Sequence, residues 1–477
     1  MSRWTRPAAR ALYTRSADPE PRAAGNDAVV CILAPADMGG GGGGMGLSGK
    51  RMPVAAAIAA VVLPAVAQGS GFHLMTQNAS GLGNAYAGHT AAAEDASTIY
   101  YNPAGLTRLP GRQASAALHA IRPSREFATG GASAAPAGLA SPGGNGGDSG
   151  DLAAVPNAYF SWQFDPRWWM GVGISVPFGL KTEYEPGWFG RFQSRRSEVK
   201  TVDINPSVAV KLTEAVSLGF GVSYQKAEVR IERSVLLLLV PPAESFARIK
   251  ADDGRFGWNA EAMFDLSPAT RIGVSYRSSM EHTLTGTIAF SSVPGVGTAV
   301  NTVSAKLEFP DAFSWGIAHQ LSPRWELLGD VTYTRWSRIK AVPLVTTSAS
   351  AVAGAGAVLD TFNFQFKDSY RVGVGANWKW RDDFTVKLGV AYDRTPVVDA
   401  FRTVTLPDAD RTLVAIGGKY RVSKQATLDF GYLHMFMKDV PINQSRGLGA
   451  VAGAQGNVIG RYEADVNIVS AQFTYRF

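Results

Sequence analysis

Few residues in this chain have the types and spacing that enzyme chemistry requires. The six histidines do not stand at metal-ligand spacings, and the single cysteine is Cys31, near the N-terminus. No Gly-x-Ser-x-Gly elbow or His-Glu-x-x-His helix occurs. The run Gly81–Ala87 fits a dinucleotide fingerprint superficially, but it does not follow a strand of a βαβ unit. The sequence therefore predicts no catalytic residue, no metal site and no cofactor.

The long C-terminal part of the chain is a series of alternating strands. In residues 216–225, apolar side chains take the even positions, and Ser, Gly or Gln take the odd ones. Residues 370–380 and 384–392 repeat this pattern, with charged residues and glycines on the same face. A soluble barrel would point its apolar face inward and its charges outward. We therefore predict that the apolar face meets lipid and that the mixed face lines a lumen.

Short turns divide these strands into hairpins. They are Phe164–Arg167, Leu212–Ala215, Leu266–Ala269, Leu321–Arg324, Trp380–Asp383 and Val422–Gln425. The connections between hairpins are longer and rich in Gly, Ala, Pro and Ser, as in residues 129–154, 291–298, 341–359 and 444–457. Short turns and long loops on opposite sides are typical of outer-membrane barrels, and six such turns predict about fourteen antiparallel strands.

Aromatic side chains gather beside the short turns. They are Trp162, Phe164, Trp168, Trp169, Phe264, Trp325, Trp378, Trp380, Phe384 and Tyr420. Amphipathic rings at one level indicate an interfacial girdle rather than the core of a sandwich. Inward glycines, such as Gly219 and Gly273, leave the lower lumen wide enough for a plug. The chain ends in a closing strand whose last residue, Phe477, resembles the signal recognised by the barrel-assembly machinery.

The composition agrees with a membrane barrel. Charged residues make up 18% of the chain, and no segment approaches the roughly 18 apolar residues of a spanning helix. A secreted all-β protein is the alternative that composition alone allows. The net charge of +7 is not organised into basic runs, so we expect no nucleic-acid partner.

The N-terminal part of the chain contains an export signal. Lys50 and Arg51 precede an apolar run that ends in Ala65-Val-Ala67, which predicts a signal peptide over residues 50–67 with cleavage after Ala67. A short buried helix is the alternative. Residues 1–49 contain nothing that reads as a folded unit, so we interpret them as a disordered extension or as the product of a mis-assigned start, with Met45 or Met52 as the true start.

A compact segment rich in small residues lies between the signal and the strands. Residues 78–89 and 100–106 show little strand alternation. We predict that residues 68–111 form a small helical hatch, a plug within a barrel made by residues 112–477.

Three groups of motifs resemble the FadL family of outer-membrane transporters of long-chain fatty acids and other hydrophobic compounds. The motifs are Gly71-Phe-His-Leu74 with residues 80–88, Asn102-Pro-Ala104, and Val176–Tyr184 followed by Trp188–Arg191 and Ile204–Ser207. The resemblance covers the chain from about Gln68 to Phe477, and it implies a fourteen-stranded barrel closed by an N-terminal hatch.

The resemblance also implies a transport route. Substrate would be captured at an outer groove, enter a deeper pocket and leave sideways at a kink in the third strand. By position, Phe72 would approach the pocket, Asn102, Pro103 and Ala104 would anchor the hatch, and Pro177, Phe178 and Gly179 would lie at the kink. A proline within a strand removes a hydrogen-bond donor from the ladder and favours a bulge or a break in the strand. The alternative is that Pro177 merely ends the strand at the following loop.

Further substrate contacts follow from apolar residues near the loops. The run Ser234–Ala243 is apolar and too short to span a membrane, so we interpret it as part of the capture groove, unless the loops merely pack on each other. Candidate substrate contacts are Phe72, Leu74, Leu236, Leu238, Leu433, Met435 and Met437, the last three by their inward parity. Lumenal Arg371 and Lys379 would pair with a substrate carboxylate or, as we favour, with Glu94 or Asp95 of the hatch.

The sequence as a whole predicts a passive transporter in the outer membrane of a Gram-negative bacterium. Its expected partners are a long-chain fatty acid or aromatic hydrocarbon as substrate, and outer-membrane lipid and lipopolysaccharide around a monomeric barrel. A general diffusion porin is the main alternative, and an outer-membrane lipid-hydrolysing enzyme is a lesser one. Pocket shape depends on packing across strands, so the sequence does not decide between fatty acid and aromatic substrates.

Overall fold

The computed structural model describes residues 70–136, 143–237, 243–293, 295–449 and 453–477. All of them belong to one compact unit, Ala60–Phe477. The predicted extension (residues 1–49) and signal peptide (residues 50–67) lie outside the described residues. Among the described residues, no helix is long and apolar enough to cross a membrane.

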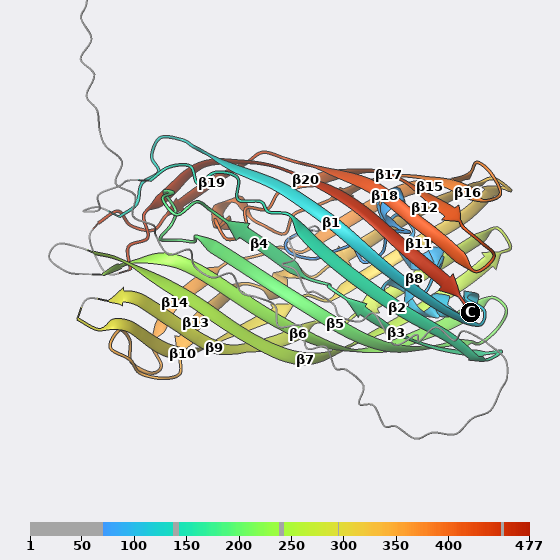
Figure 1. Ribbon diagram of the computed structural model, residues 1–477, viewed down its shortest axis with the longest axis horizontal. Coiled ribbons are helices and arrows are strands. Elements are labelled where there is room, and N and C mark those ends of the chain that lie inside the picture. The colour runs from blue at the N-terminus through green and yellow to red at the C-terminus, as the bar shows by residue number, and fades with distance from the viewer. Residues whose placement is uncertain (1–69, 137–142, 238–242, 294, 450–452) are drawn as a thin grey trace, which may run out of the picture. The chain divides into compact units, whose positions relative to one another are not determined.

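One antiparallel sheet contains all twenty strand segments (Figure 1). They are β1 Arg112–Thr129, β2 Ala153–Asp165, β3 Trp168–Ser175, β4 Gly179–Glu183, β5 Arg196–Lys211, β6 Val216–Leu237, β7 Ala243–Ser267, β8 Thr270–Arg277, β9 Met280–Val293, β10 Gly297–Phe309, β11 Ala312–Ser322, β12 Trp325–Thr334, β13 Ala341–Thr346, β14 Val358–Asn363, β15 Ser369–Lys379, β16 Phe384–Asp393, β17 Arg411–Arg421, β18 Ala426–Met437, β19 Val440–Ser445 and β20 Asn457–Arg476. Consecutive segments join into fourteen strands, and β1 pairs with β20 to close a barrel. The predicted fold class is confirmed.

Short helical turns make up the hatch, which the barrel strands enclose (Figure 1). They are η1 Leu82–Asn84, α1 His89–Ala92, α2 Thr98–Tyr101 and η2 Pro103–Arg108. Two further 3-10 turns, η3 Trp336–Arg338 and η4 Asp399–Phe401, lie among the strands. The hatch fits because the wall facing it carries glycines. A Cβ on Gly273 would lie 1.9 Å from the Thr90 carbonyl oxygen, and one on Gly219 would lie 2.3 Å from the Ala104 nitrogen.

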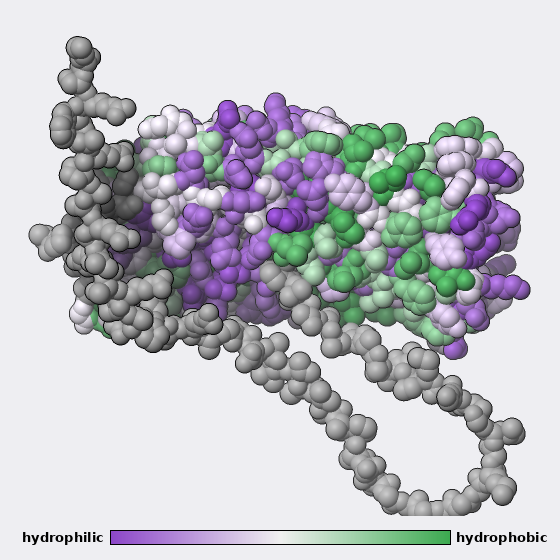
Figure 2. Space-filling view, turned by 45° about the horizontal axis from the view of Figure 1, so that its top comes forward, coloured by the Kyte–Doolittle hydropathy of each residue, from purple (hydrophilic) through white to green (hydrophobic). Residues whose placement is uncertain are grey.

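The exposure of side chains follows the predicted parity. Leu218, Phe220 and Tyr224 on β6 are 40%, 46% and 42% exposed, whereas Ser217 and Gln225 on the other face are buried. Figure 2 shows hydrophobic residues gathered over the half of the wall nearer the short turns, and hydrophilic residues over much of the other half. All six predicted turns lie between consecutive strands. Trp169 departs from the predicted girdle, because it is buried and donates its indole N–H to the Leu109 carbonyl of the hatch, 2.9 Å away.

Two predicted loops are largely strand. Strand β6 runs to Leu237 and β7 begins at Ala243, so Ser234–Leu237 is paired wall rather than loop. Residues 291–298 are likewise mostly the ends of β9 and β10. Ser and Gly, which made residues 291–298 resemble a loop, are compatible with a ladder wherever a neighbouring strand satisfies the backbone.

The third barrel strand is interrupted between β3 and β4. Ser175 pairs with Asp203 and Gly179 pairs with Lys200, so residues 176–178 face only two residues of β5. One extra residue constitutes a β-bulge, which bends a strand and disrupts the local ladder. After it the parity reverses, and Leu180 rather than Lys181 faces the lumen with Val199.

Candidate functional site

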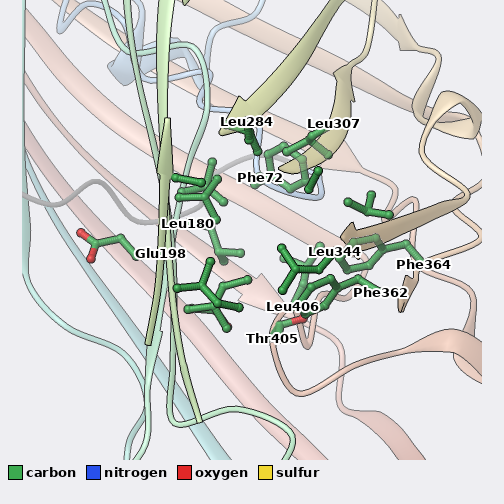
Figure 3. Close-up of a pocket in the computed structure, with 18 of the residues that line it drawn as sticks. Phe72, Leu180, Glu198, Leu284, Leu307, Leu344, Phe362, Phe364, Thr405 and Leu406 are labelled. Carbon is green, nitrogen blue, oxygen red and sulfur yellow. The ribbon is translucent and has the colours of Figure 1, made fainter. Parts of the chain in front are cut away.

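An apolar cavity of about 100 Å³ lies inside the barrel beside the start of the hatch (Figure 3). Its wall comes mainly from β4–β7, β9, β10, β13 and β14, whose inward aliphatic residues form one surface. The lining residues are Phe72, Leu180, Ser197, Glu198, Val199, Val229, Ile231, Ile249, Ala251, Leu284, Val303, Ala305, Leu307, Val342, Leu344, Phe362, Phe364, Thr405 and Leu406. Concave, apolar and largely preformed sites of this kind suit hydrophobic ligands.

Aromatic rings surround Phe72 at the hatch side of the cavity. Its ring centroid lies 4.8 Å from that of Trp336, 5.8 Å from Phe309 and 5.9 Å from Phe178, all edge-to-face. Such pairs contribute roughly 0.5–1.5 kcal/mol each beyond burial. The indole nitrogen of Trp336 is buried and has no hydrogen-bond partner among the described residues. Phe72 therefore belongs both to the cavity wall and to the hatch.

The cavity lining offers no positive charge. Among the described residues that line it, the only ionisable side chain is Glu198, and Figure 3 shows its carboxylate on the far side of the strand from the cavity. That carboxylate lies 2.7 Å from the Arg196 guanidinium and 2.9 Å from the Lys200 ammonium. The hydroxyls of Ser197 and Thr405 are the remaining polar side-chain groups. A carboxylate inside this cavity would be desolvated without a partner, at a cost of several kcal/mol.

The first residues of the hatch pair with the bulged strand. The Leu74 amide donates to the Pro177 carbonyl at 2.7 Å, and the Gly179 amide donates to the Phe72 carbonyl at 2.9 Å. His73 and Phe178 form the antiparallel bridge between these two bonds. The Phe178 amide bonds instead to the Thr201 hydroxyl of β5, at 2.9 Å. The hatch thus supplies a short strand at the edge that the bulge leaves open.

The side chain of Gln77 closes the rest of this gap. Its amide nitrogen donates to the carbonyl oxygens of Leu74 and Val176, at 2.8 and 2.7 Å. Its amide oxygen accepts from the Asn157 side chain of β2 at 2.8 Å and from the Val176 amide at 3.1 Å. Gln77 is completely buried. One side chain therefore links β2 and the bulge where the ladder between them is interrupted.

Two carboxylates hold the start of the described chain. The Ser70 amide donates to Asp393 at 2.8 Å, and the Gly71 amide donates to Asp408 at 2.9 Å. Both carboxylates are buried beside Arg411, whose guanidinium lies 2.6 Å from Asp408. Burial, together with the nearby Arg277, lowers the pKa of His73, two residues further on, to about 3. His73 is therefore neutral at pH 7 in this arrangement.

The body of the hatch is held by ion pairs. Glu94 lies 2.7 Å from the Lys387 ammonium and 2.6 Å from that of Lys419. Burial alone would raise the pKa of Glu94, but these two ammonium groups outweigh it and lower the pKa to about 2. The expectation that Arg371 and Lys379 pair with hatch carboxylates was wrong. Arg371 bonds Asp330 of the wall and the Ala85 carbonyl of the hatch, and Lys379 pairs with Asp382 in its own turn.

The Asn102-Pro-Ala104 motif starts η2 and contacts the wall. The Asn102 side chain accepts from the Ala104 amide at 3.0 Å, as an N-cap does, and Pro103 takes the first helical position. The side-chain amide nitrogen of Asn102 donates to the carbonyls of Thr90 in the hatch and Ala262 in β7, at 2.7 and 3.1 Å. The motif therefore ties two hatch turns to one barrel strand.

The other candidate substrate contacts lie apart from the cavity. Leu74, Leu433 and Met435 are buried together in a cluster between hatch and wall, and Met437 packs against that cluster. Leu236 is buried in a separate small cluster with Phe192. Leu238 lies outside the described residues. Among these residues, only Phe72 lines the cavity. The side chains of Leu433, Met435 and Met437 point inward as predicted, but they pack in the cluster between hatch and wall rather than against the cavity.

Sequence reasoning missed Gln77, Trp336 and most of the cavity lining. The lining residues come from strands that are distant in sequence, and each looks like an ordinary inward Val or Leu. The one signal for Gln77 in the sequence was a polar Gln within a segment of small residues. Among the described residues, no group of His, Cys, Asp and Glu side chains is placed to hold a metal ion.

Comparisons with known proteins agree with this architecture. A family model described as outer membrane protein transport protein (OMPP1/FadL/TodX) matches residues 60–477. An outer membrane protein of Neisseria meningitidis serogroup B is 28% identical over 445 residues, covering 86% of this chain and 95% of that protein. The long-chain fatty acid transport protein of Salmonella typhi is 27% identical over 421 residues, covering 82% and 93%.

A solved structure has the same fold. The Pseudomonas aeruginosa FadL homologue has a TM-score of 0.76 at 23% identity, and the match covers 86% of this chain and all of that one. The family model spans the whole described barrel and hatch. The chain therefore belongs to the FadL/TodX family of outer-membrane transport proteins, which are found in Gram-negative bacteria and are transporters rather than enzymes.

Proposed function

We propose that this protein mediates the passive uptake of long-chain fatty acids or other hydrophobic compounds across the outer membrane. The family and the name of the Salmonella typhi relative support this class of substrate. The observation that carries the proposal is the position of Phe72. It lines the apolar cavity, and its carbonyl also bonds Gly179 at the interrupted strand.

The geometry favours a coupled route from cavity to membrane. A hydrophobic molecule that fills the cavity competes with Phe72 for the same apolar surface. When the Phe72 backbone moves with its ring, the bond that its carbonyl accepts from Gly179 breaks, and the adjacent bond between Leu74 and Pro177 is strained. The gap beside the bulge at residues 176–178 then becomes the lateral exit. Substrate moves down its own gradient, so no cofactor or covalent step is needed.

Uncharged substrates are the best match for the cavity. The described lining residues carry no cation, and aromatic or alkyl groups need none. A fatty acid would fit with its hydrocarbon chain in the cavity and its carboxylate outside. Capture from outside would begin near the loops, where Leu236 and Leu238 remain candidates for the outer groove.

A general diffusion porin is a poorer match. A porin needs an open aqueous lumen, whereas hatch and wall here are in contact, as at Gly273 and Gly219.

The barrel itself suggests further partners, namely the surrounding lipids and the machinery that assembles the barrel. Lipid and lipopolysaccharide would surround a monomer, and the barrel-assembly machinery would recognise Phe477, which is 58% exposed at the end of β20.

Uptake by cells tests this function directly. Cells that carry the protein should accumulate labelled toluene and labelled oleate faster than cells that lack it, and toluene should show the larger difference. Phe72→Ala should reduce the difference several-fold without reducing the amount of folded barrel. Equal uptake of both compounds by cells with and without the protein would refute the proposal.

A further inference from the structure

A row of polar side chains crosses the barrel wall next to the apolar cavity. Asp203 of β5 pairs with Gln225 of β6, and Gln225 pairs with Arg255 of β7. Directly opposed side chains on one face of a sheet lie about 5 Å apart. We call Asp203, Gln225 and Arg255 the polar row. Because side chains alternate along a strand, the row shares its face with the cavity-lining residues four positions away, Val199, Val229 and Ala251.

The buried end of the polar row has unused hydrogen-bonding capacity. Asp203 and Gln225 are both completely buried. Neither oxygen of the Asp203 carboxylate and neither end of the Gln225 amide has a hydrogen-bond partner of normal geometry among the described residues, although Ser223 and Gln225 both lie beside the carboxylate. Buried polar groups are almost always satisfied by protein, water or a ligand. These two side chains can together accept from and donate to one added group.

Arg255 does not supply a free positive charge. Its Nε donates to the Asp253 carboxylate at 2.8 Å, and the same oxygen accepts from the Thr283 amide at 3.1 Å. The His282 ring lies 3.3 Å from that carboxylate. Arg277 lies close enough to Asp203 to interact with its charge, and its guanidinium already donates to the Ser223 hydroxyl at 3.3 Å and to the Tyr100 carbonyl at 2.8 Å. The described surroundings of the row thus pair two carboxylates, Asp203 and Asp253, with two cations, Arg277 and Arg255, and a ligand carboxylate would be repelled by Asp203 while competing with it for Arg277. An uncharged polar group meets no such repulsion.

The row also adjoins the interrupted strand. Ser175, the last paired residue of β3 before the bulge, pairs with Asp203. On the face of β6 that carries the row, Ala227 lies between Gln225 and the cavity residue Val229, and it packs in one cluster with Phe72 and Phe178. The ring of Phe72, which lines the cavity, and the neighbouring ring of Phe178 therefore pack with the wall between the cavity and the row. Movement of Phe72 would join the two.

We propose that the polar row is a head-group subsite for an uncharged hydroxyl, as in an alcohol or phenol, on a molecule whose hydrocarbon part occupies the apolar cavity. The hydroxyl would donate to Asp203 and accept from Gln225. This inference rests on the proposed transport function, and it adds that the protein selects for amphiphilic rather than purely hydrocarbon substrates.

Binding of a matched ligand pair tests the subsite. The full protein in lipid nanodiscs is titrated calorimetrically with propylbenzene and with 4-propylphenol, which differ by one hydroxyl. Two added hydrogen bonds should make the phenol bind about ten-fold more tightly. The variant Asp203→Leu/Gln225→Leu should lose this preference and keep its affinity for propylbenzene. Asp203→Asn, which preserves shape, should lose about half of the preference on a logarithmic scale.

Gln113→Leu provides the matched control. Gln113 is also a buried lumenal glutamine whose side-chain oxygen has no partner among the described residues, but it lies on β1, away from the row. It should keep the full preference. Equal binding of the two compounds by the unaltered protein would mean that the row only binds water or pairs internally, and would overturn the subsite alone. Tighter binding of 4-propylbenzoate than of the phenol would also overturn it, and failure of all the compounds to bind would overturn the transport function with it.

Discussion

The two ends of the hatch are held in the barrel by different kinds of interaction. The hatch body, residues 78–111, is fixed by buried charge, with Glu94 between Lys387 and Lys419. The N-terminal segment, residues 70–77, contributes no charged side chain at pH 7. It is held by backbone hydrogen bonds, two of them to the carboxylates of Asp393 and Asp408, by the Gln77 amide and by the ring of Phe72.

This difference separates a fixed part from a displaceable one. Breaking a buried ion pair leaves an uncompensated charge and costs about 3–5 kcal/mol. A neutral hydrogen bond contributes only about 0.5–1.5 kcal/mol net, and a hydrogen bond to a charged group, such as those of Ser70 and Gly71, contributes about 1.5–3 kcal/mol. The N-terminal segment touches both the cavity and the bulge, and among the described residues it has no ion pair to the wall. We therefore propose that the hatch body keeps the lumen closed while a ligand displaces the N-terminal segment.

The largest expected effect comes from the fixed part. Glu94→Ala removes the hatch carboxylate that lies between the ammonium groups of Lys387 and Lys419, and it leaves them only the more distant Asp429 of the wall, at 3.6 and 4.0 Å. The Lys387 side chain is 2% exposed. The attachment of the hatch body should weaken by about 3–5 kcal/mol. Single-channel recordings in planar bilayers should then show frequent openings that the unaltered protein lacks. Unchanged conductance would show that these ion pairs do not hold the hatch.

The next effect is expected in the displaceable part. Gln77→Leu keeps the side-chain volume but removes the bonds between Asn157, Val176 and Leu74. Each buried group left unsatisfied costs about 1–3 kcal/mol, so amide hydrogen exchange in residues 72–77 and 176–179 should accelerate at least ten-fold. Conductance should stay low, because the hatch body is still attached. Equal exchange in both proteins would contradict this role of Gln77.

Acid should release the two parts in different pH ranges. His73 has a pKa of about 3 when the N-terminal segment is bound to the wall and 6.5 when the segment is displaced and exposed to water. Protonation of His73 therefore favours the displaced segment as the pH falls from 6.5 toward 3. At pH 5 the equilibrium constant for displacement of the segment is about thirty times its value at a pH well above 6.5. Glu94, with a pKa of about 2 against 4.5, keeps its full contribution above pH 4.5 and loses it only as the pH falls toward 2.

Cysteine accessibility measures the first of these transitions. The rate of maleimide labelling of Ser70→Cys, divided by that of an exposed Ser423→Cys control, should rise between pH 6.5 and pH 5. The rise should vanish in the His73→Gln background. A rise of equal size in that background would assign the acid response to another group.

The smallest effect is expected at an exposed ion pair. Lys306 and Glu281 lie 3.2 Å apart, and their side chains are 70% and 55% exposed. Glu281→Ala should change the free energy of unfolding by less than about 0.5 kcal/mol, because water screens such pairs. The thermal unfolding of Glu281→Ala should be compared with that of Glu94→Ala. Both variants remove one carboxylate from an ion pair, so a difference between their effects on stability measures the effect of burial.

The fold was predictable because it depends on local pattern. Alternation along each strand and the six short turns determine the strand number and the lipid-facing side. The errors arose where tertiary contacts override local composition. Trp169 sits among girdle aromatics in sequence, but it turns inward to bond Leu109 of the hatch. Ser234–Leu237 reads as a loop, but it pairs with the start of β7.

The site was less predictable, because no local pattern encodes it. Phe72 was identified through the family motif, whereas its neighbours Trp336 and Phe309 come from distant parts of the chain. Arg371 and Lys379 were correctly placed on the inward face, yet their partners depended on where the hatch turns lie. Parity indicates which side chains enter the lumen, and only the packed structure shows which of them meet a cavity.

We propose that the N-terminal segment must leave the bulged strand for substrate to pass. His73→Cys with Phe178→Cys would place a disulfide across the antiparallel bridge between them. A control disulfide, Thr107→Cys with Ser217→Cys, would lock the other end of the hatch to β6, where the two hydroxyls lie 2.8 Å apart. Oxidation should abolish toluene uptake in the first variant, reductant should restore it, and the control should transport normally throughout. Undiminished uptake through the oxidised first variant would contradict the claim.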